Sequence, residues 1–512
     1  KNLIANNARP VATYLRNEKF FDSEDTKTSI EKIKEKFKSK HKNLFSPHAI
    51  LQSVEEGLNL TFEQAIKNER KLFSDCIKSP QREGLIHSFF SERAVNKIPE
   101  LKNGKPKSID KIGVIGGGTM GTGISMAALN SGFSVIMIEQ DEQGINKALE
   151  KINSTYERSV SLGRISANEK ERILSNFKSL TDLNSLSDRD LIIEAVFEEM
   201  EIKKEVFTKL NTICSNETIL ASNTSYLNVN EIAEVVSNPE RVIGLHFFSP
   251  ANIMKLLEIV VAEKTSNNTV ATAFSLAKAM KKIPVRSGVC DGFIGNRILS
   301  KYLVATYHMV EDGASVFDID RVIRDFGCAM GPFQVIDLAG GDIGWATRKR
   351  KAPSRNKNDR YVEIPDRVCE RGWFGQKTGK GYYLYGKDVP FLTPNPEINQ
   401  ICNEERKRAG VNPKEFTDQE ILNKYISSLV LEGVKILEEK ISLRPSDIDV
   451  VYINGYGFPR WRGGPMNYAD SIGLEKILNN IKNYEKEDPR FWKCPNLLTK
   501  LVSENKCFKD LN

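Results

Sequence analysis

The chain has 512 residues, with 74 basic and 67 acidic side chains and a formal net charge of +7 at pH 7. This length allows about three domains with cores of their own, and no apolar run approaches the ~20 residues of a membrane-spanning helix. The mild positive charge does not indicate a nucleic-acid-binding protein, and it suits a small anionic ligand.

Residues 1–107 are polar, and their apolar side chains recur at helical spacing. We therefore expect a helical N-terminal region. It shows no catalytic constellation, so we expect His41, His48 and His87 to lie on the surface. The lysine-rich run at 32–42 is typical of a solvated helix face.

A glycine motif follows the first apolar run of the next region. Ile112 to Ile115 has the composition of a buried strand, and G-x-G-x-x-G follows it with Gly116, Gly118 and Gly121. The first glycine allows a tight turn, the second lets the backbone approach a pyrophosphate, and the third lets helix and strand pack closely. The N–H groups at the start of the helix then bind phosphate.

An acidic residue completes this dinucleotide fingerprint. A second apolar strand, residues 135–138, ends at Glu139, roughly 20 residues after the first glycine. A carboxylate in this position accepts hydrogen bonds from a ribose 2′-hydroxyl and repels a 2′-phosphate. The sequence therefore predicts NAD rather than NADP as the cofactor.

Strands and helices alternate over residues 108–288, which predicts a doubly wound, mainly parallel α/β sheet of the Rossmann type. Ligands of such sheets bind at the carboxyl ends of the strands. Ser225, His246 and Ser249 follow predicted strands there, so we expect them near a ligand.

His246 is the candidate proton-transfer group. Glu258 lies in an apolar run shortly after it, and a buried carboxylate needs a partner. An imidazole would supply one, and the carboxylate would fix its tautomer and stabilise its charged form. A histidine alone would more often be a satisfied core residue.

From about residue 291 the chain becomes helical, and two stretches resemble each other. Lys301-Tyr302 recurs as Lys424-Tyr425, and the step from Gly331 to Asp337 equals that from Gly464 to Asp470. We expect a duplicated helical domain, with copies at residues 289–390 and 415–512. The basic stretch 348–360 between them is expected to be an exposed loop.

Several of these motifs together resemble the L-3-hydroxyacyl-CoA dehydrogenase family. The resemblance runs from about residue 109 to the end and rests on the glycine motif with Glu139, Ser222-Asn223-Thr224-Ser225, His246-Phe247-Phe248-Ser249-Pro250, Met254 to Glu258 and Asp291 to Arg297. It implies oxidation of L-3-hydroxyacyl-CoA to 3-oxoacyl-CoA with NAD, in fatty-acid β-oxidation.

The resemblance also assigns roles to residues. His246 would be the catalytic acid/base, Glu258 would orient it, and Ser225 and Asn296 would bind the reacting oxygen or the substrate. Four further side chains would lie near NAD: Glu198, Lys203, Ser249 and Lys377. No metal is expected, because the eight cysteines contain no C-x-x-C pair; their scatter also favours reduced thiols inside a cell.

The peroxisomal multifunctional branch of the family is the most similar. It implies a monomer, because a second helical copy would replace the partner subunit, and a peroxisomal location, although the C-terminus, Lys509 to Asn512, is not of the S-K-L type. Mitochondrial and cytoplasmic locations remain alternatives.

Residues 1–107 lack the paired glutamates and oxyanion loop of the branch's hydratase domain, so we expect no hydratase activity.

Two other functions stay open. One is a different β-hydroxyacid dehydrogenase on the same nucleotide fold, although those enzymes usually rely on a lysine base. The other is a non-catalytic homologue that binds NAD or CoA, because an intact pocket does not prove turnover.

Overall fold

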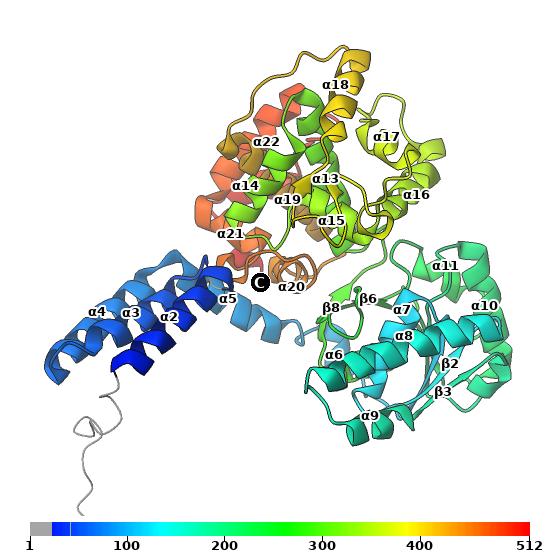
Figure 1. The fold of residues 1–512 in the computed structure, drawn as a ribbon. Coiled ribbons are helices and arrows are strands. Elements are labelled where there is room, and N and C mark those ends of the chain that lie inside the picture. Colours follow the sequence, from blue (N-terminus) through cyan, green and yellow to red (C-terminus); the bar gives the residue numbers. More distant parts are fainter. Residues whose placement is uncertain (1–22, 41) are drawn as a thin grey trace, which may run out of the picture. The chain divides into compact units, whose positions relative to one another are not determined.

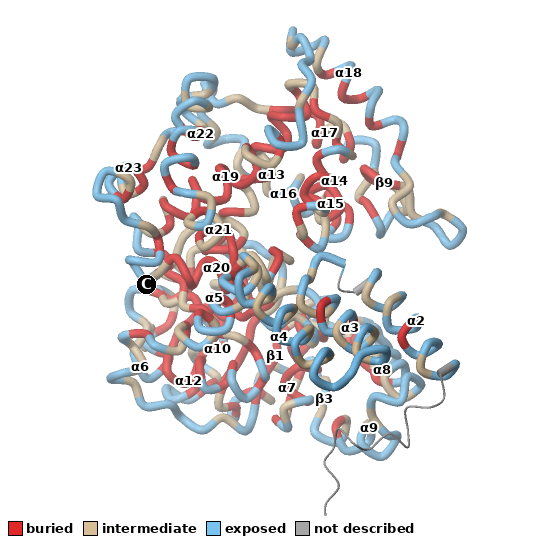
Figure 2. The backbone as a smooth tube through the Cα atoms, turned by 90° about the vertical axis from the view of Figure 1, so that its left-hand side faces the viewer, coloured by how far each residue is buried: buried red, intermediate tan, exposed pale blue. Residues whose placement is uncertain are grey.

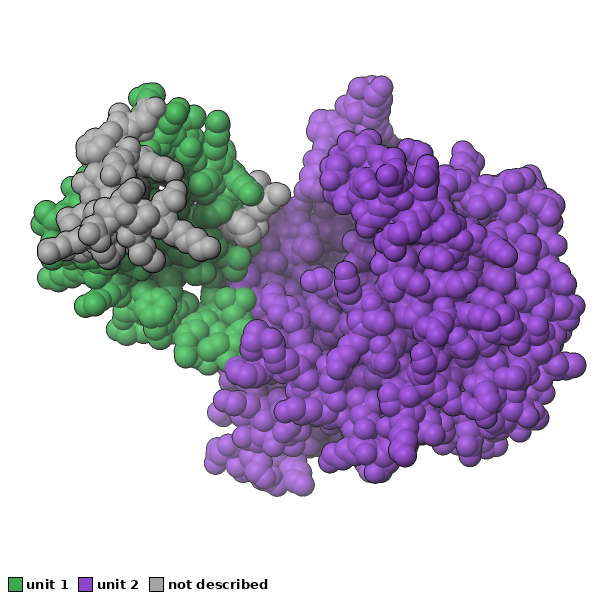
Figure 3. Space-filling model, turned by 90° about the horizontal axis from the view of Figure 1, so that it is seen from below, with its two compact units in different colours: residues 1–86 green, residues 87–512 purple. Residues whose placement is uncertain are grey.

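The computed structural model describes residues 23–40 and 42–512. His41 and part of the lysine-rich run therefore lie outside the described residues. The chain divides into two compact units, residues 1–86 and residues 87–512, which Figure 3 shows in green and purple.

The first unit is helical where it is described, as the spacing of its apolar residues predicts. Thr61 begins one helix with a capping box, in which Thr61 and Gln64 each bond the backbone N–H of the other. His48 is exposed, as expected. The helices are α2 (Ser23–Lys40), α3 (Phe45–Gly57), α4 (Phe62–Lys78) and the first part of α5 (Pro80–Ala94).

The second unit contains an eight-stranded sheet in the order β3-β2-β1-β4-β5-β6-β7-β8. The pairs are parallel except for β6 with β7. This is the mainly parallel, doubly wound sheet that the sequence predicts. Its strands are β1 (Lys111–Ile115), β2 (Ser134–Ile138), β3 (Phe177–Leu180), β4 (Leu191–Glu194), β5 (Ile219–Ser222), β6 (Val242–Phe247), β7 (Leu256–Val260) and β8 (Ile283–Ser287).

Helices connect the strands and pack against them. Small residues let α7 come close to its neighbours: a Cβ on Gly123 would lie 3.1 Å from the Cβ of Ala251. In Figure 1, α7 and α8 lie along strands β1 to β3. These helices are α6 (Pro99–Asn103), α7 (Thr119–Leu129), α8 (Glu142–Ser161), α9 (Ala167–Leu174), α10 (Met200–Ile213), α11 (Val229–Ala233) and α12 (Asn267–Ala279).

The remainder of the second unit is helical, apart from the short strands β9 (Tyr383–Leu384) and β10 (Thr393–Pro394). Figure 2 shows buried residues, in red, following α14, α15 and α19 to α21. Within the described residues, no helix is long and apolar enough to cross a membrane. The helices are α13 (Gly295–Asp312), α14 (Val316–Phe326), α15 (Pro332–Ala339), α16 (Gly341–Lys351), α17 (Ile364–Glu370), α18 (Glu397–Ala409), α19 (Asp418–Glu438), α20 (Pro445–Gly455), α21 (Pro465–Ile472), α22 (Leu474–Glu487) and α23 (Asn496–Ser503).

The basic stretch 348–360 is not simply an exposed loop, so that expectation was wrong in part. Its first residues form the last turn of α16. At its other end, Arg360 forms ion pairs with Glu311 and Asp312, each at 2.6 Å. These acids lie on α13, far away in sequence, and the run of basic residues gave no sign of them.

The surface position expected for His87 was also wrong. Its side chain is 17% exposed, and its Nε2 lies 2.8 Å from Oδ2 of Asp449. Asp449 is buried on α20, 362 residues further along the chain. A buried carboxylate needs such a partner, and only the fold brings this one to it.

Candidate active site

The glycine turn between β1 and α7 is built from backbone that only glycine fits. Gly116 has a φ of 98°, in the left-handed region. A Cβ on Gly121 would lie 1.7 Å from the carbonyl oxygen of Gly116, so the helix can approach the strand only without a side chain there. These are the roles that the motif predicts for its first and third glycines.

The backbone of this turn is open at Gly118. A Cβ on Gly118 would meet no atom within 4 Å, and this glycine precedes α7 without a side-chain cap. The N–H groups of the first turn are therefore open to phosphate. At the end of β2, the carboxylate of Glu139 accepts hydrogen bonds from the N–H groups of Gly117 and Gln140, which hold it beside the turn.

The resemblance places Glu198 and Lys203 near NAD. In the structure they form a hydrogen-bonded cluster with Glu194, the last residue of β4. The Lys203 ammonium is 1% exposed and lies 2.6 Å from Glu194 and 3.4 Å from Glu198. Glu198 also accepts hydrogen bonds from the N–H groups of Ser225 and Tyr226 at 2.7 and 3.0 Å. The cluster thus fixes the turn that carries Ser225.

The expected histidine–glutamate contact is present in the sheet. His246 and Glu258 face each other in the antiparallel register of β6 and β7, and Nδ1 of the imidazole lies 2.7 Å from Oε2 of the carboxylate. Both side chains are buried, at 4% and 0% exposure. The other carboxylate oxygen accepts a hydrogen bond from the N–H of Gly295 at 2.9 Å, so both oxygens of Glu258 have donors.

Aromatic side chains pack close to the imidazole. The ring centroids of Phe248 and Phe293 lie 4.5 and 5.6 Å from that of His246. Phe248 in turn packs at 5.6 Å against Tyr456. This environment keeps water away from the imidazole and strengthens its interaction with the carboxylate.

Asn296 is held by a residue that the motif reading did not single out as functional. The hydroxyl of Tyr456 donates a hydrogen bond to Oδ1 of Asn296 at 2.8 Å. Burial raises the pKa of Tyr456 well above its ordinary value, so the phenol stays protonated and able to donate. Tyr456 stands in the glycine-rich stretch 455–464, and nothing in its sequence neighbours shows that it meets α13.

The loop after β6 is held by another residue that sequence reasoning missed. Ser249 is exposed and precedes Pro250 in a cis peptide bond. The buried ammonium of Lys282 donates to the carbonyl oxygens of Ala251 and Met254, the latter at 2.6 Å. Burial lowers the pKa of Lys282 to about 8.

Lys377 does not join these groups. It lies in the helical part, and its ammonium pairs with Asp342 at the start of α16. In the described part of the chain, no hydrogen bond or ion pair connects it to the glycine turn or to the histidine–glutamate pair.

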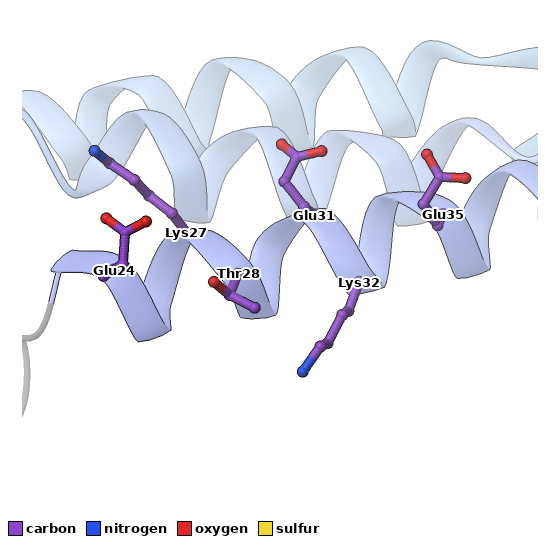
Figure 4. A pocket seen from close by; sticks show the side chains of 6 residues that line it. All are labelled: Glu24, Lys27, Thr28, Glu31, Lys32 and Glu35. Carbon is purple, nitrogen blue, oxygen red and sulfur yellow. The ribbon is translucent and has the colours of Figure 1, made fainter.

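Features elsewhere in the chain offer less chemistry. Figure 4 shows a shallow hollow on α2 lined by Glu24, Lys27, Thr28, Glu31, Lys32 and Glu35. Its mixed charges are those of a solvated helix face. No group of three or more potential metal ligands gathers anywhere in residues 23–40 and 42–512.

Comparison with known families assigns the region that contains the site. The description "3-hydroxyacyl-CoA dehydrogenase, NAD binding domain" matches residues 111–290, and "3-hydroxyacyl-CoA dehydrogenase, C-terminal domain" matches residues 292–385. A solved structure, the dehydrogenase part of multifunctional enzyme 1 from C. elegans, is 30% identical with a TM-score of 0.60, covering 82% of this chain and 98% of that one. The chain belongs to the 3-hydroxyacyl-CoA dehydrogenase family. The family resemblance seen in the sequence is thus confirmed.

Two relatives of the chain are named peroxisomal bifunctional enzyme. The peroxisomal bifunctional enzyme of Danio rerio is 41% identical over 87% of this chain, and that of Homo sapiens is 38% identical over 89%. The chain spans only 64% and 65% of the lengths of these two relatives.

Proposed function

We propose that the chain catalyses the NAD-dependent oxidation of L-3-hydroxyacyl-CoA to 3-oxoacyl-CoA in fatty-acid β-oxidation. The observation that carries the proposal is the 2.7 Å contact between His246 and Glu258 at the end of β6, in a domain that belongs to an NAD-binding family. A buried imidazole with a bonded carboxylate is the arrangement of a general base.

The protein's part in the reaction is proton transfer. NAD⁺, when bound at the glycine turn, supplies the hydride acceptor. Glu258 accepts from Nδ1–H of His246, which leaves the lone pair of Nε2 to take the proton of the substrate's 3-hydroxyl. As the imidazole becomes positively charged, the carboxylate stabilises it. The N–H of Gly295 keeps the carboxylate in place.

Ser225 and Asn296 are proposed to hold the reacting oxygen or the thioester carbonyl. Ser225 follows β5 on a turn fixed by Glu198, and Asn296 is held by Tyr456, so both are positioned before substrate arrives. Contacts to NAD are proposed for Gly116, Gly118, Gly121, Glu139, Glu198, Lys203, Ser249 and, with the least support from geometry, Lys377.

We also propose that the helical part is duplicated, at residues 289–390 and 415–512 after an NAD-binding domain at 108–288. Matching contacts support this. Asp320 on α14 accepts from backbone N–H groups at the start of α15, and Asp449 on α20 does the same for α21. Asp337 and Asp470 each accept from two consecutive N–H groups. A second copy in the same chain would make the enzyme a monomer.

A peroxisomal location is proposed because the relatives are named as peroxisomal enzymes. It would be overturned if the native protein fractionated with another compartment.

The proposed reaction is tested in reverse, with acetoacetyl-CoA and NADH, by following the loss of NADH absorbance. The proposal expects NADH consumption that depends on the thioester and much slower consumption of NADPH. Binding of NADH without any consumption would indicate a non-catalytic homologue. Turnover of a different β-keto acid in place of the thioester would indicate another dehydrogenase.

A further inference from the structure

The last turn of α16 carries four consecutive basic residues, Arg348 to Lys351, here called the basic turn. The proposed chemistry of proton transfer does not use them. Arg348 is committed to the fold, because its Nε lies 2.7 Å from Asp366 and the side chain is 18% exposed. The other three, Lys349, Arg350 and Lys351, are available for a different role.

The outer residues of the basic turn have more positive charge than their partners neutralise. Arg350 and Lys351 share one carboxylate, that of Asp291, at 2.9 and 2.8 Å. Lys349 is exposed, and its ammonium lies 3.8 Å from the ring centroid of Trp345. Among the described residues, no carboxylate forms an ion pair with Lys349. The basic turn therefore keeps a net positive charge in solvent.

The basic turn lies beside the proposed reaction centre. Asp291 precedes Gly292, and a Cβ on Gly292 would lie 3.2 Å from the Cβ of Asn296. On the other side, the guanidinium of Arg350 lies 5.8 Å from the ring centroid of Tyr226, the neighbour of Ser225. A cationic surface thus borders the turn that carries Ser225 and the start of α13, which carries Asn296.

We propose that the basic turn binds the phosphate groups of the coenzyme A part of the substrate. This inference rests on the proposed function, which supplies a thioester with a polyanionic end. The guanidinium of Arg350 can bond two phosphate oxygens at once, Lys349 adds a mobile point charge, and Trp345 offers an aromatic plane. The phosphates of NAD have a separate place at the start of α7.

Basic residues also occur at helix ends for a purely structural reason, because they interact favourably with the helix dipole. The last turn of α18 provides a matched example, with Lys407 and Arg408 exposed. That turn serves as the control, since within the described chain neither side chain forms a hydrogen bond or ion pair with the proposed reaction centre.

The test measures the binding of CoA and of pantetheine, which lacks the nucleotide phosphates, by titration calorimetry. Lys349→Gln with Arg350→Gln should weaken CoA binding roughly tenfold and leave pantetheine binding within about twofold. Arg350→Lys in the otherwise native chain keeps the charge but loses the two-oxygen contact, so it should weaken CoA binding less than the double variant does. Lys407→Gln with Arg408→Gln should change neither ligand.

Three outcomes would overturn the inference. One is a wild-type chain that binds CoA no more tightly than pantetheine. The second is a loss in the basic-turn variant that is equal for both ligands. The third is a loss of NADH affinity instead, which would assign the turn to the dinucleotide. Binding is measured without turnover. A chain that consumes no NADH would therefore refute the proposed function, and the CoA titration would still decide whether the basic turn binds phosphate.

Discussion

Two histidines are buried in the second unit, and they differ in the distance from the imidazole to its carboxylate partner. Nδ1 of His246 lies 2.7 Å from Glu258, within a hydrogen bond, whereas Nδ1 of His308 lies 4.0 Å from Asp488. Nε2 of His308 has no hydrogen-bond partner among the described residues, and burial lowers the pKa of His308 to about 4. His308 lines a polar cavity of about 380 Å³ together with Arg360, Asp488 and Trp492.

The comparison shows why burial by itself is not the basis for proposing His246 as the general base. Burial without a bonded carboxylate disfavours the imidazolium and leaves a neutral core residue. A carboxylate in contact with Nδ1 instead orients the ring and stabilises the charge that it acquires during proton transfer. The strand register of β6 and β7 supplies that carboxylate to His246, and no strand does so for His308 on α13.

The largest expected effect is on His246 itself. In His246→Gln, kcat should fall by roughly 10²–10⁴-fold, the range for loss of a general acid or base, while the affinity for NADH stays nearly unchanged. Steady-state kinetics and NADH titration check this. His308→Gln is the matched control and should keep most of its turnover. Near-normal kcat in His246→Gln would reject the assignment.

Glu258→Gln should make His246 resemble His308. The amide cannot stabilise the imidazolium and can bond the wrong tautomer, so kcat should fall by roughly 10²-fold with little change in KM. Glu263→Gln, an exposed glutamate a few residues beyond β7, provides the control. If Glu258→Gln retained full turnover, the carboxylate would be structural and the comparison would fail.

His308 should influence stability rather than turnover. Its pKa is lowered from 6.5 to about 4 in the folded chain, chiefly by burial, so the unfolded chain takes up the proton first as the pH falls. The free energy of unfolding should therefore decrease as the pH is lowered, by about 2 kcal/mol from about pH 7 to about pH 5. Urea unfolding of His308→Gln should show a correspondingly smaller pH dependence. An identical dependence in both proteins would contradict the burial argument.

Tyr456→Phe gives the smallest expected effect. It removes the 2.8 Å hydrogen bond to Asn296, worth ~1 kcal/mol, and KM for acetoacetyl-CoA should rise about fivefold. Tyr468→Phe serves as a control on α21. A fall in NADH affinity instead would move Asn296 out of the substrate site.

Local patterns in the sequence predicted much of the fold. The glycine motif, the apolar strand runs and the acid at Glu139 depend on neighbours within about 30 residues, so they can be read directly. The His246–Glu258 contact could be predicted for the same reason. The two residues lie close in sequence, and an antiparallel pair of strands joined by one loop brings them together.

Contacts between distant segments could not be predicted. Tyr456 meets Asn296 across 160 residues, and His87 meets Asp449 across 362. Arg360 and Lys282 likewise find their partners only in the folded chain. Buried polar groups are satisfied wherever the fold supplies a donor, and a residue's own sequence neighbours do not show where that is.

The most direct test is the tautomer of His246, measured by ¹⁵N NMR on the chain labelled at histidine. If Glu258 prepares His246 as the base, its neutral ring should carry the proton on Nδ1 and leave Nε2 free, and Glu258→Gln should disturb this state. A wild-type His246 with the proton on Nε2 could not accept one from the substrate, and it would contradict the account.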